Sequence, residues 1–246
     1  MVVDWPEHCA VVIPCLNEAA SIASVVAQAR THLSCVVVVD DGSSDATARL
    51  AADSRAHVLR HDTPRGKGAA LKTGLSWSFA RGFTWALTMD GDGQHLARDI
   101  PSFLARAVAT DAALVVGNRM SNPTAMPWIR RKVNQWMSHR LSGLAGPLLP
   151  DSQCGFRLFQ LGVWSSLDLR TTHFEVESEL LLAFLAANER VEFVPIQVVY
   201  NQETSKIRPM LDTWRWLRWW RRTSRSGVAS PNLERRKPFS AFEKQS

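Results

Sequence analysis

Short apolar runs rich in β-branched residues alternate with helix-forming segments over the first 120 residues, and this alternation constrains the fold more than any other feature. The runs cover residues 10–14, 35–40, 57–60, 84–90 and 112–118, and the helical patterns cover residues 18–31, 44–54, 66–81 and 99–109. Several runs are almost continuously apolar, as in strands buried on both faces of a parallel sheet. The alternation predicts an α/β fold with a mostly parallel central sheet and helices on both faces.

The second half of the chain is less regular. After a turn cluster at 122–127, a helical stretch carries one apolar stripe made of Ile129, Val133, Trp136, Met137, Leu141 and Leu144. Residues 154–160 and 191–200 have strand patterns, and residues 174–188 have a helical pattern. We expect a folded domain over 1–206, an amphipathic helix over 207–225, and a disordered tail over 226–246, where Ser, Pro, Arg and Lys dominate.

Composition narrows the class of protein. The 246 residues carry a formal net charge of +6, which favours an anionic partner. No apolar run approaches the roughly 18 residues of a membrane-spanning helix. The N-terminal stretch carries Asp4 and Glu7 and no basic region, so we expect no signal peptide and a cytoplasmic location. The four cysteines lack C-x-x-C spacing, as expected for reduced thiols.

Acidic residues follow two of the predicted strands. Asp40 and Asp41 come after a Val run, and Asp90 and Asp92 lie in the segment D-G-D-G-Q-H. Two carboxylates at one strand end suit Mg²⁺ or Mn²⁺ shared with substrate phosphates. The same residues could simply form turns. An EF-hand is excluded because its later oxygen ligands are missing.

The other strand ends could contribute to the same site. Residues 13–18 (IPCLNE) end the first strand, and the loop 65–74 (RGKGAALKTG) could either cradle a phosphate or simply lead into a helix, with Arg65 and Lys67 available to an anion. Neither a P-loop nor a G-x-G-x-x-G motif follows the first strand, so ATPase and dinucleotide-binding functions are disfavoured. A nucleotidyltransferase would need a basic, Gly-rich signature there, and PCLNEA does not supply it.

In order, the segments VVIPCLNE, VVDDGSSDAT, RGKGAALKTG, MDGDGQH, GNR and DSQCGFR resemble the family 2 glycosyltransferases, in particular the dolichyl- or polyprenyl-phosphate sugar synthases. The resemblance spans residues 8–206. It implies the GT-A fold, a nucleotide-diphosphate sugar donor (GDP- or UDP-sugar), Mg²⁺ or Mn²⁺, and transfer of a hexose with inversion. The implied acceptor is a polyprenyl or dolichyl phosphate at the cytosolic face of a membrane.

The resemblance also implies roles for single residues on the donor side. The residues matching nucleoside contacts are Pro14, Leu16, Glu18, Val39 and Asp41. Asp90, Gly91 and Asp92 match the metal and diphosphate motif, with Gln94 as a further metal ligand. Arg119 matches an arginine that meets the diphosphate, so Asp90, Asp92 and Arg119 are the predicted catalytic residues.

On the acceptor side the match is less complete. Arg131 and Lys206 match basic residues near the acceptor phosphate, and Asp151 and Arg157 match residues that line the site. Leu16 replaces a Tyr of many relatives, and Tyr200 stands where the phosphate-using enzymes have Arg. A lipid hydroxyl or another glycolipid is therefore an alternative acceptor. It would need a carboxylate base, for which the candidates are Glu175, Glu177 and Glu179.

The segment 210–225 mixes Arg and Trp. As a helix it has one basic stripe and one apolar stripe, made respectively of Arg215, Arg218, Arg222 and Arg225 and of Met210, Trp214, Leu217 and Trp220. This pattern predicts peripheral binding to an anionic membrane surface. Alternatively, the tryptophans pack against the domain. Nothing else resembles a nucleic-acid module, and the retained acidic and Arg motifs disfavour a catalytically silent scaffold.

Overall fold

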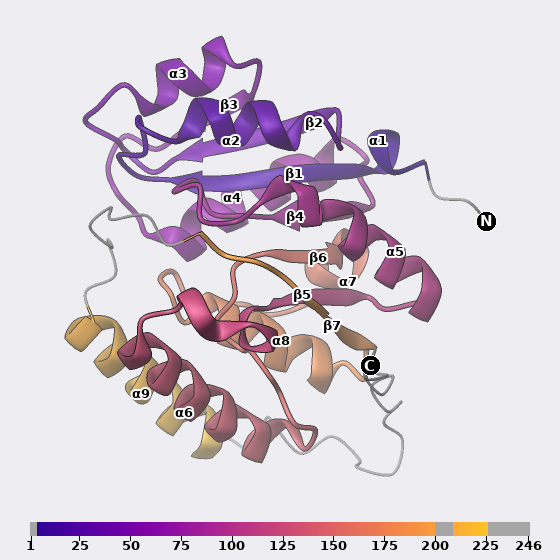
Figure 1. Ribbon diagram of the computed structural model, residues 1–246, viewed down its shortest axis with the longest axis vertical. Helices are drawn as coiled ribbons and strands as arrows, with labels where there is room; N and C mark the ends of the chain where they lie inside the picture. The colour runs from indigo at the N-terminus through magenta and orange to yellow at the C-terminus, as the bar shows by residue number, and fades with distance from the viewer. Residues whose placement is uncertain (1–3, 200–208, 226–246) are drawn as a thin grey trace.

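A mixed sheet of seven strands, in the order β3-β2-β1-β4-β6-β5-β7, forms the centre of the molecule (Figure 1). The computed structural model describes residues 4–199 and 209–225. The strands are β1 (Cys9–Cys15), β2 (Cys35–Asp40), β3 (His57–Arg60), β4 (Trp85–Thr88), β5 (Leu114–Asn118), β6 (Arg157–Gln160) and β7 (Val191–Pro195). Strand β6 runs antiparallel to β4 and β5, whereas the other paired strands are parallel.

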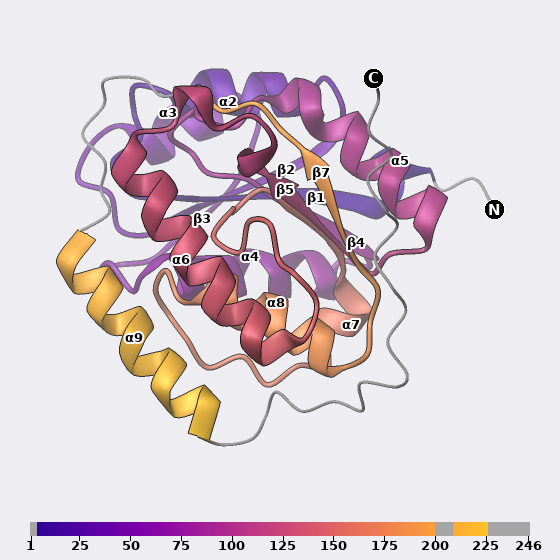
Figure 2. The ribbon, with the colours of Figure 1, turned by 60° about the horizontal axis from the view of Figure 1, so that its bottom comes forward.

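Helices cover both faces of the sheet (Figure 2). On one side lie α2 (Ile22–Ala29) and α5 (Ile100–Thr110), and on the other lie α4 (Lys67–Ala80), α7 (Leu161–Ser165) and α8 (Val176–Ala186). The other elements are α1 (Trp5–His8), α3 (Thr47–Asp53), α6 (Trp128–Ala145), α9 (Pro209–Arg225) and the 3₁₀ turns η1 (Ala97–Asp99), η2 (Arg119–Ser121) and η3 (Pro123–Ala125). The predicted α/β architecture, a mostly parallel sheet with helices on both faces, is confirmed.

The continuously apolar strands form the core, as their sequences predict. The side chains of β1 and β2 are buried over nearly their whole length. Helix α4 packs closely on them at Gly74, where a Cβ atom would lie 2.5 Å from Val12 Cγ1 and 2.9 Å from Val39 Cγ2. A glycine at this position therefore sets the distance between helix and sheet.

Two predicted strands are shorter than expected. The strand predicted at 84–90 ends at Thr88, because the Asp90 N–H turns away to donate to His95 Nδ1 (3.1 Å). The strand predicted at 191–200 ends at Pro195, which has no N–H to donate to a ladder. The chain beyond it runs beside the loop that follows β4, since Val198 forms an antiparallel bridge with His95.

Helix α6 buries Met137 and Leu141 of the predicted apolar stripe, but not its first half. Ile129 and Val133 are 59% and 38% exposed, whereas Asn134 and Ser138 are buried. The prediction was wrong for this half of the helix because these polar side chains have buried partners. Asn134 donates to Asp151, and the Ser138 hydroxyl lies 3.0 Å from that of Ser152.

Helix α9 packs on α6 and α8, so that α6 and α9 lie side by side (Figures 1 and 2). The buried Trp216 donates from Nε1 to Ser178 Oγ (2.9 Å), and its ring centroid lies 5.5 Å from that of Trp136. Of the tryptophans in 210–225, Trp216 therefore packs against the domain. Tyr200, Lys206 and the predicted tail lie outside the described residues. Within the described ranges, no helix has the length and apolar character needed to span a membrane.

Candidate active site

The carboxyl ends of β1, β2 and β4 meet at one edge of the sheet, because these strands are parallel neighbours. The first two bring Pro14, Leu16 and Glu18 next to Val39 and Asp41, and the third brings the D-G-D segment. Gly91 packs against the first strand end: a Cβ there would lie 2.5 Å from Cys15 Sγ and 3.4 Å from Glu18 Cγ. The fold therefore assembles the predicted donor residues at one edge.

Asp41 holds the following loop in place. Its Oδ1 accepts the Arg65 N–H (2.8 Å) and lies 2.7 Å from His61 Nδ1, and its Oδ2 accepts the Gly66 N–H (2.8 Å). The carboxylate is buried, and its contacts in this structure hold the loop at residues 65–66. A contact with the nucleoside stays a prediction.

The RGKG loop leads into α4 and does not form a phosphate cradle. The N–H groups of Arg65 and Gly66 donate to Asp41, while those of Gly68 and Ala69 donate to the carbonyl oxygen of Thr172. Because these amide N–H groups already have acceptors within the protein, they do not form a phosphate cradle. The alternative prediction, a loop that leads into a helix, is the correct one.

Lys67 joins two carboxylates from distant parts of the chain. Its Nζ lies 2.6 Å from Asp90 Oδ1 and 2.7 Å from Glu177 Oε1. Burial alone would raise the pKa of Asp90, but the charge of Lys67, with smaller contributions from His95 and Arg119, lowers it to about 2. Burial likewise opposes the charge of Lys67, yet the two carboxylates raise the pKa of its ammonium group. Lys67 is therefore engaged with Asp90 and Glu177, contrary to the expectation that it is available to an anion.

The pKa of Asp92 is shifted in the opposite direction to that of Asp90. Burial, and then repulsion by the Asp90 carboxylate, raise the pKa of Asp92, although its Oδ1 accepts the Gln94 N–H (3.0 Å). Burial also lowers the pKa of His95, so this ring is neutral near pH 7 and accepts the Asp90 N–H at Nδ1. The two carboxylates repel each other in a partly buried site. A divalent cation bound to their oxygens would relieve this repulsion.

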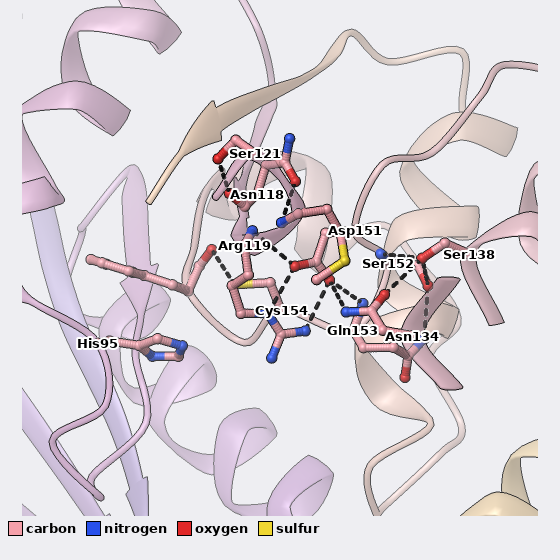
Figure 3. A network of polar contacts seen from close by, with 12 residues as sticks. His95, Asn118, Arg119, Ser121, Asn134, Ser138, Asp151, Ser152, Gln153 and Cys154 are labelled. Carbon is pink, nitrogen blue, oxygen red and sulfur yellow. Dashed lines mark hydrogen bonds and ion pairs between the residues drawn. The ribbon is translucent and has the colours of Figure 1, made fainter. Parts of the chain in front are cut away.

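Arg119 is oriented by Asp151 (Figure 3). The Arg119 side chain donates from Nε (2.8 Å) and Nη2 (2.9 Å) to the buried carboxylate, and its backbone N–H donates a third bond (3.0 Å). Asn134 of α6 donates to the same carboxylate (2.8 Å). Burial raises the pKa of Asp151, but Arg119 holds the net pKa below its ordinary value. Asp151 thus positions the predicted diphosphate-binding arginine.

The remaining acceptor-side residues have distinct surroundings. Arg157 is buried, and its guanidinium donates to the carbonyl oxygens of Ser152, Cys154 and Glu177, so it joins the loop before β6 to the first turn of α8. Arg131 lies exposed on α6, nearly one turn before Asn134. Lys206 lies outside the described residues.

The three glutamates proposed as bases also differ. Glu179 accepts the Arg170 and Thr171 N–H groups and the Thr171 hydroxyl, so it is engaged in fixing a loop. Glu177 is buried beside Lys67, and Glu175 is half-buried at the start of α8.

Sequence reasoning missed several partners at this site. The Lys67–Asp90–Glu177 contact, the His95 acceptor and the Asn134–Asp151 bond were not predicted. The sequence did carry a signal for the contact between His95 and Asp90, because a histidine so close to strand-end acids can contact them. Within the described ranges, no cluster of three or more His, Cys, Asp or Glu side chains is arranged to hold a metal.

Comparison with known proteins identifies the family. The model of glycosyl transferase family 2 matches residues 10–163. The chain belongs to this family. As a family 2 glycosyltransferase it is 32% identical over 212 residues to the undecaprenyl-phosphate mannosyltransferase of Micrococcus luteus, covering 78% of this chain and 83% of the relative.

Further relatives of this glycosyltransferase have similar names. It is 28% identical over 214 residues to the UDP-N-acetylglucosamine–dolichyl-phosphate N-acetylglucosaminyltransferase of Methanococcus voltae (78% of this chain, 85% of the relative). It is 28% identical over 218 residues to the polyprenol monophosphomannose synthase of Mycolicibacterium smegmatis (81% and 80%).

Solved structures confirm the fold. Glucosyl-3-phosphoglycerate synthase from Mycobacterium tuberculosis, in complex with Mn²⁺, UDP and phosphoglyceric acid, matches with a TM-score of 0.69 at 20% identity. The match covers 92% of this glycosyltransferase and 80% of that chain. The same enzyme with Mg²⁺ and UDP matches with a TM-score of 0.65 at 22% identity, covering 92% and 81%.

Proposed function

We propose that this glycosyltransferase moves a hexose from a GDP- or UDP-sugar to a polyprenyl or dolichyl phosphate, with inversion, at the cytosolic face of a membrane. The observation that carries the proposal is that Asp90 and Asp92 follow β4 and Arg119 follows β5 at the carboxyl edge of the sheet, where ligands bind in open α/β folds, with Arg119 near enough to Asp90 to help lower its pKa. The names of the relatives support the choice of acceptor.

The residues present fit a divalent metal and a diphosphate. Asp90 and Asp92 would hold Mg²⁺ or Mn²⁺, with Gln94 as the further ligand that the family resemblance implies. When bound, the metal supplies a Lewis acid that stabilises the leaving diphosphate. Structures of the mycobacterial neighbour contain these metals with UDP, which supports the assignment. Arg119, held by Asp151, would add charge-assisted hydrogen bonds to the same diphosphate.

A phosphate acceptor simplifies the rest of the reaction. A phosphate monoester carries about −1.5 to −2 charges at pH 7. Its attacking oxygen is then already anionic, so the protein must position it and need not deprotonate it. No general base is then required, in agreement with the contacts of Glu177 with Lys67 and of Glu179 with Thr171. Arg131 and Lys206 would hold the acceptor phosphate.

Metal removal and two groups of variants test these assignments. EDTA and Asp92→Ala should each abolish transfer without loss of the folded circular dichroism spectrum. Arg131→Ala and Lys206→Ala should raise the acceptor KM more than the donor KM. Full activity in EDTA would contradict the metal assignment, and a rise confined to the donor KM would contradict the acceptor assignment.

Peripheral membrane binding is the remaining part of the proposal. Trp214 of α9 is 55% exposed with Arg218 over its ring (5.4 Å), and Trp128 of the neighbouring α6 is 73% exposed. Each Arg near an anionic surface contributes about 1 kcal/mol. Deleting 207–246 should therefore reduce sedimentation with anionic vesicles, most clearly at low salt. Equal sedimentation of the full-length and truncated proteins would refute a membrane role for this segment.

A further inference from the structure

Two cations at the candidate active site each contact a buried carboxylate from outside the D-G-D segment. The Arg119 guanidinium donates to Asp151 (2.8 and 2.9 Å). The Lys67 ammonium group contacts Glu177, with Nζ lying 2.7 Å from Oε1. Because each cation has a counter-charge of its own, the two negative charges of the D-G-D aspartates are left to match a divalent cation.

The Lys67 ammonium group is confined between two carboxylates. Its Nζ lies 2.6 Å from Asp90 Oδ1 as well as 2.7 Å from Glu177 Oε1. Gly155 borders this place, since a Cβ atom there would lie 2.9 Å from Lys67 Nζ and 3.0 Å from Asp90 Oδ1. The centroid of the Phe174 ring lies 5.6 Å from the same Nζ atom. The positive charge is therefore held beside one of the predicted metal ligands.

The Glu177 side chain contributes charge more than hydrogen bonds. Its Oε1 contacts Lys67, and its Oε2 has no hydrogen-bond partner among residues 4–199 and 209–225. Arg157 is a second cation beside it, since its guanidinium donates to the Glu177 carbonyl oxygen. Without the Glu177 carboxylate, the charges of Lys67 and Arg157 would be less balanced, and their field would oppose a divalent cation at Asp90.

We propose that Glu177 is a positioning residue for the metal: it holds Lys67 and balances its charge, and thereby raises the affinity of Asp90 and Asp92 for Mg²⁺ or Mn²⁺. The inference rests on the metal-dependent function proposed above. Glu177 acts here as a fixed charge through Lys67. This role differs from that of a general base, because a base must reach the acceptor and take up its proton.

Titration of the full-length protein with Mn²⁺ at neutral pH tests this role, with free Mn²⁺ followed by electron paramagnetic resonance and no donor present. Glu177→Gln keeps the size of the side chain but removes its charge, and it should weaken Mn²⁺ binding at least about tenfold. Lys67→Met removes the opposing positive charge and should strengthen binding at least about threefold. The combined variant removes both charges and should bind Mn²⁺ within about threefold of the wild type.

Glu192→Gln is the matched control. Glu192 is also a buried carboxylate paired with a cation, since its Oε1 lies 3.0 Å from Arg190 Nε. It lies near the start of β7, whereas the metal-binding edge is at the carboxyl ends of the strands. This variant should leave the affinity for Mn²⁺ unchanged.

The outcomes separate this inference from the proposed function. An unchanged Mn²⁺ affinity in Glu177→Gln would overturn the inference alone. Binding by the combined variant that is weaker than binding by Glu177→Gln would also overturn it, because loss of structure and not of charge would then be the cause. Asp92→Ala should abolish Mn²⁺ binding. No binding by the wild type, or binding that survives Asp92→Ala, would contradict the proposed metal site and this inference with it.

Discussion

Replacing Lys67 with methionine should destabilise the fold and show how strongly the acidic site depends on this one cation. The variant keeps a long side chain but leaves the Asp90 and Glu177 carboxylates facing each other without the charge that joins them. The two side chains are 29% and 6% exposed, so water cannot fully replace the ammonium group.

The structure sets the magnitude. The pKa of Asp90 falls from 3.8 to about 2, which at about 1.4 kcal/mol per unit is on the order of 2 kcal/mol. Leaving a buried charge without its partner costs about 3–5 kcal/mol. Because Asp90 is partly exposed, we expect a loss of about 3 kcal/mol at pH 7. A lowered pKa means that the contribution of Asp90 is present above its ordinary value and is lost as pH falls through about 2.

Urea denaturation of both proteins between pH 8 and pH 3 measures this effect. The difference in unfolding free energy should be constant above about pH 5 and shrink below about pH 4. The control is Arg49→Met, which breaks an ion pair with Asp53 whose side chains are 69% and 62% exposed. That variant should lose at most about 0.5 kcal/mol. A Lys67→Met loss no larger than the control, or a difference that does not vary with pH, would refute the reasoning.

Two further substitutions have matched controls. Gly155→Ala places a Cβ 2.9 Å from Lys67 Nζ, so kcat/KM should fall at least about tenfold, whereas Gly162→Ala, with nothing within 4 Å, should be nearly neutral; equal activities would contradict the packing. Trp216→Ala removes a buried indole and should cost about 3–5 kcal/mol in urea unfolding, whereas the exposed Trp214→Ala should cost at most about 0.5 kcal/mol; similar losses would mean that α9 does not pack as described.

The fold was largely predictable because its signals are local. The buried strands β1 and β2 have runs rich in Val, and acidic residues follow both the β2 run and the mostly apolar β4 segment, so both the sheet and its functional edge could be inferred. The contacts of Lys67 could not, since they join side chains from α4, the end of β4 and α8, which only the tertiary fold brings together.

Helix α6 shows a second limit. Its inward face includes Asn134, which bonds to Asp151, so the apolar stripe indicated Met137 and Leu141 correctly but Ile129 and Val133 wrongly. The sequence also could not show that the amides of the RGKG loop are unavailable to a phosphate, because their acceptors, Asp41 and Thr172, come from elsewhere in the chain.

The central claim is that the Asp90–Asp92 edge transfers a sugar to a lipid phosphate, and a lipid-extraction assay tests it most directly. Full-length protein is incubated with radiolabelled GDP- and UDP-sugars, Mg²⁺ or Mn²⁺, and either polyprenyl phosphate or the matching polyprenol. Label from one donor should enter the organic phase with the phosphate only, and none should enter it with Asp92→Ala. Label that stays in the aqueous phase with every donor, or that reaches polyprenol as readily as polyprenyl phosphate, would contradict the account.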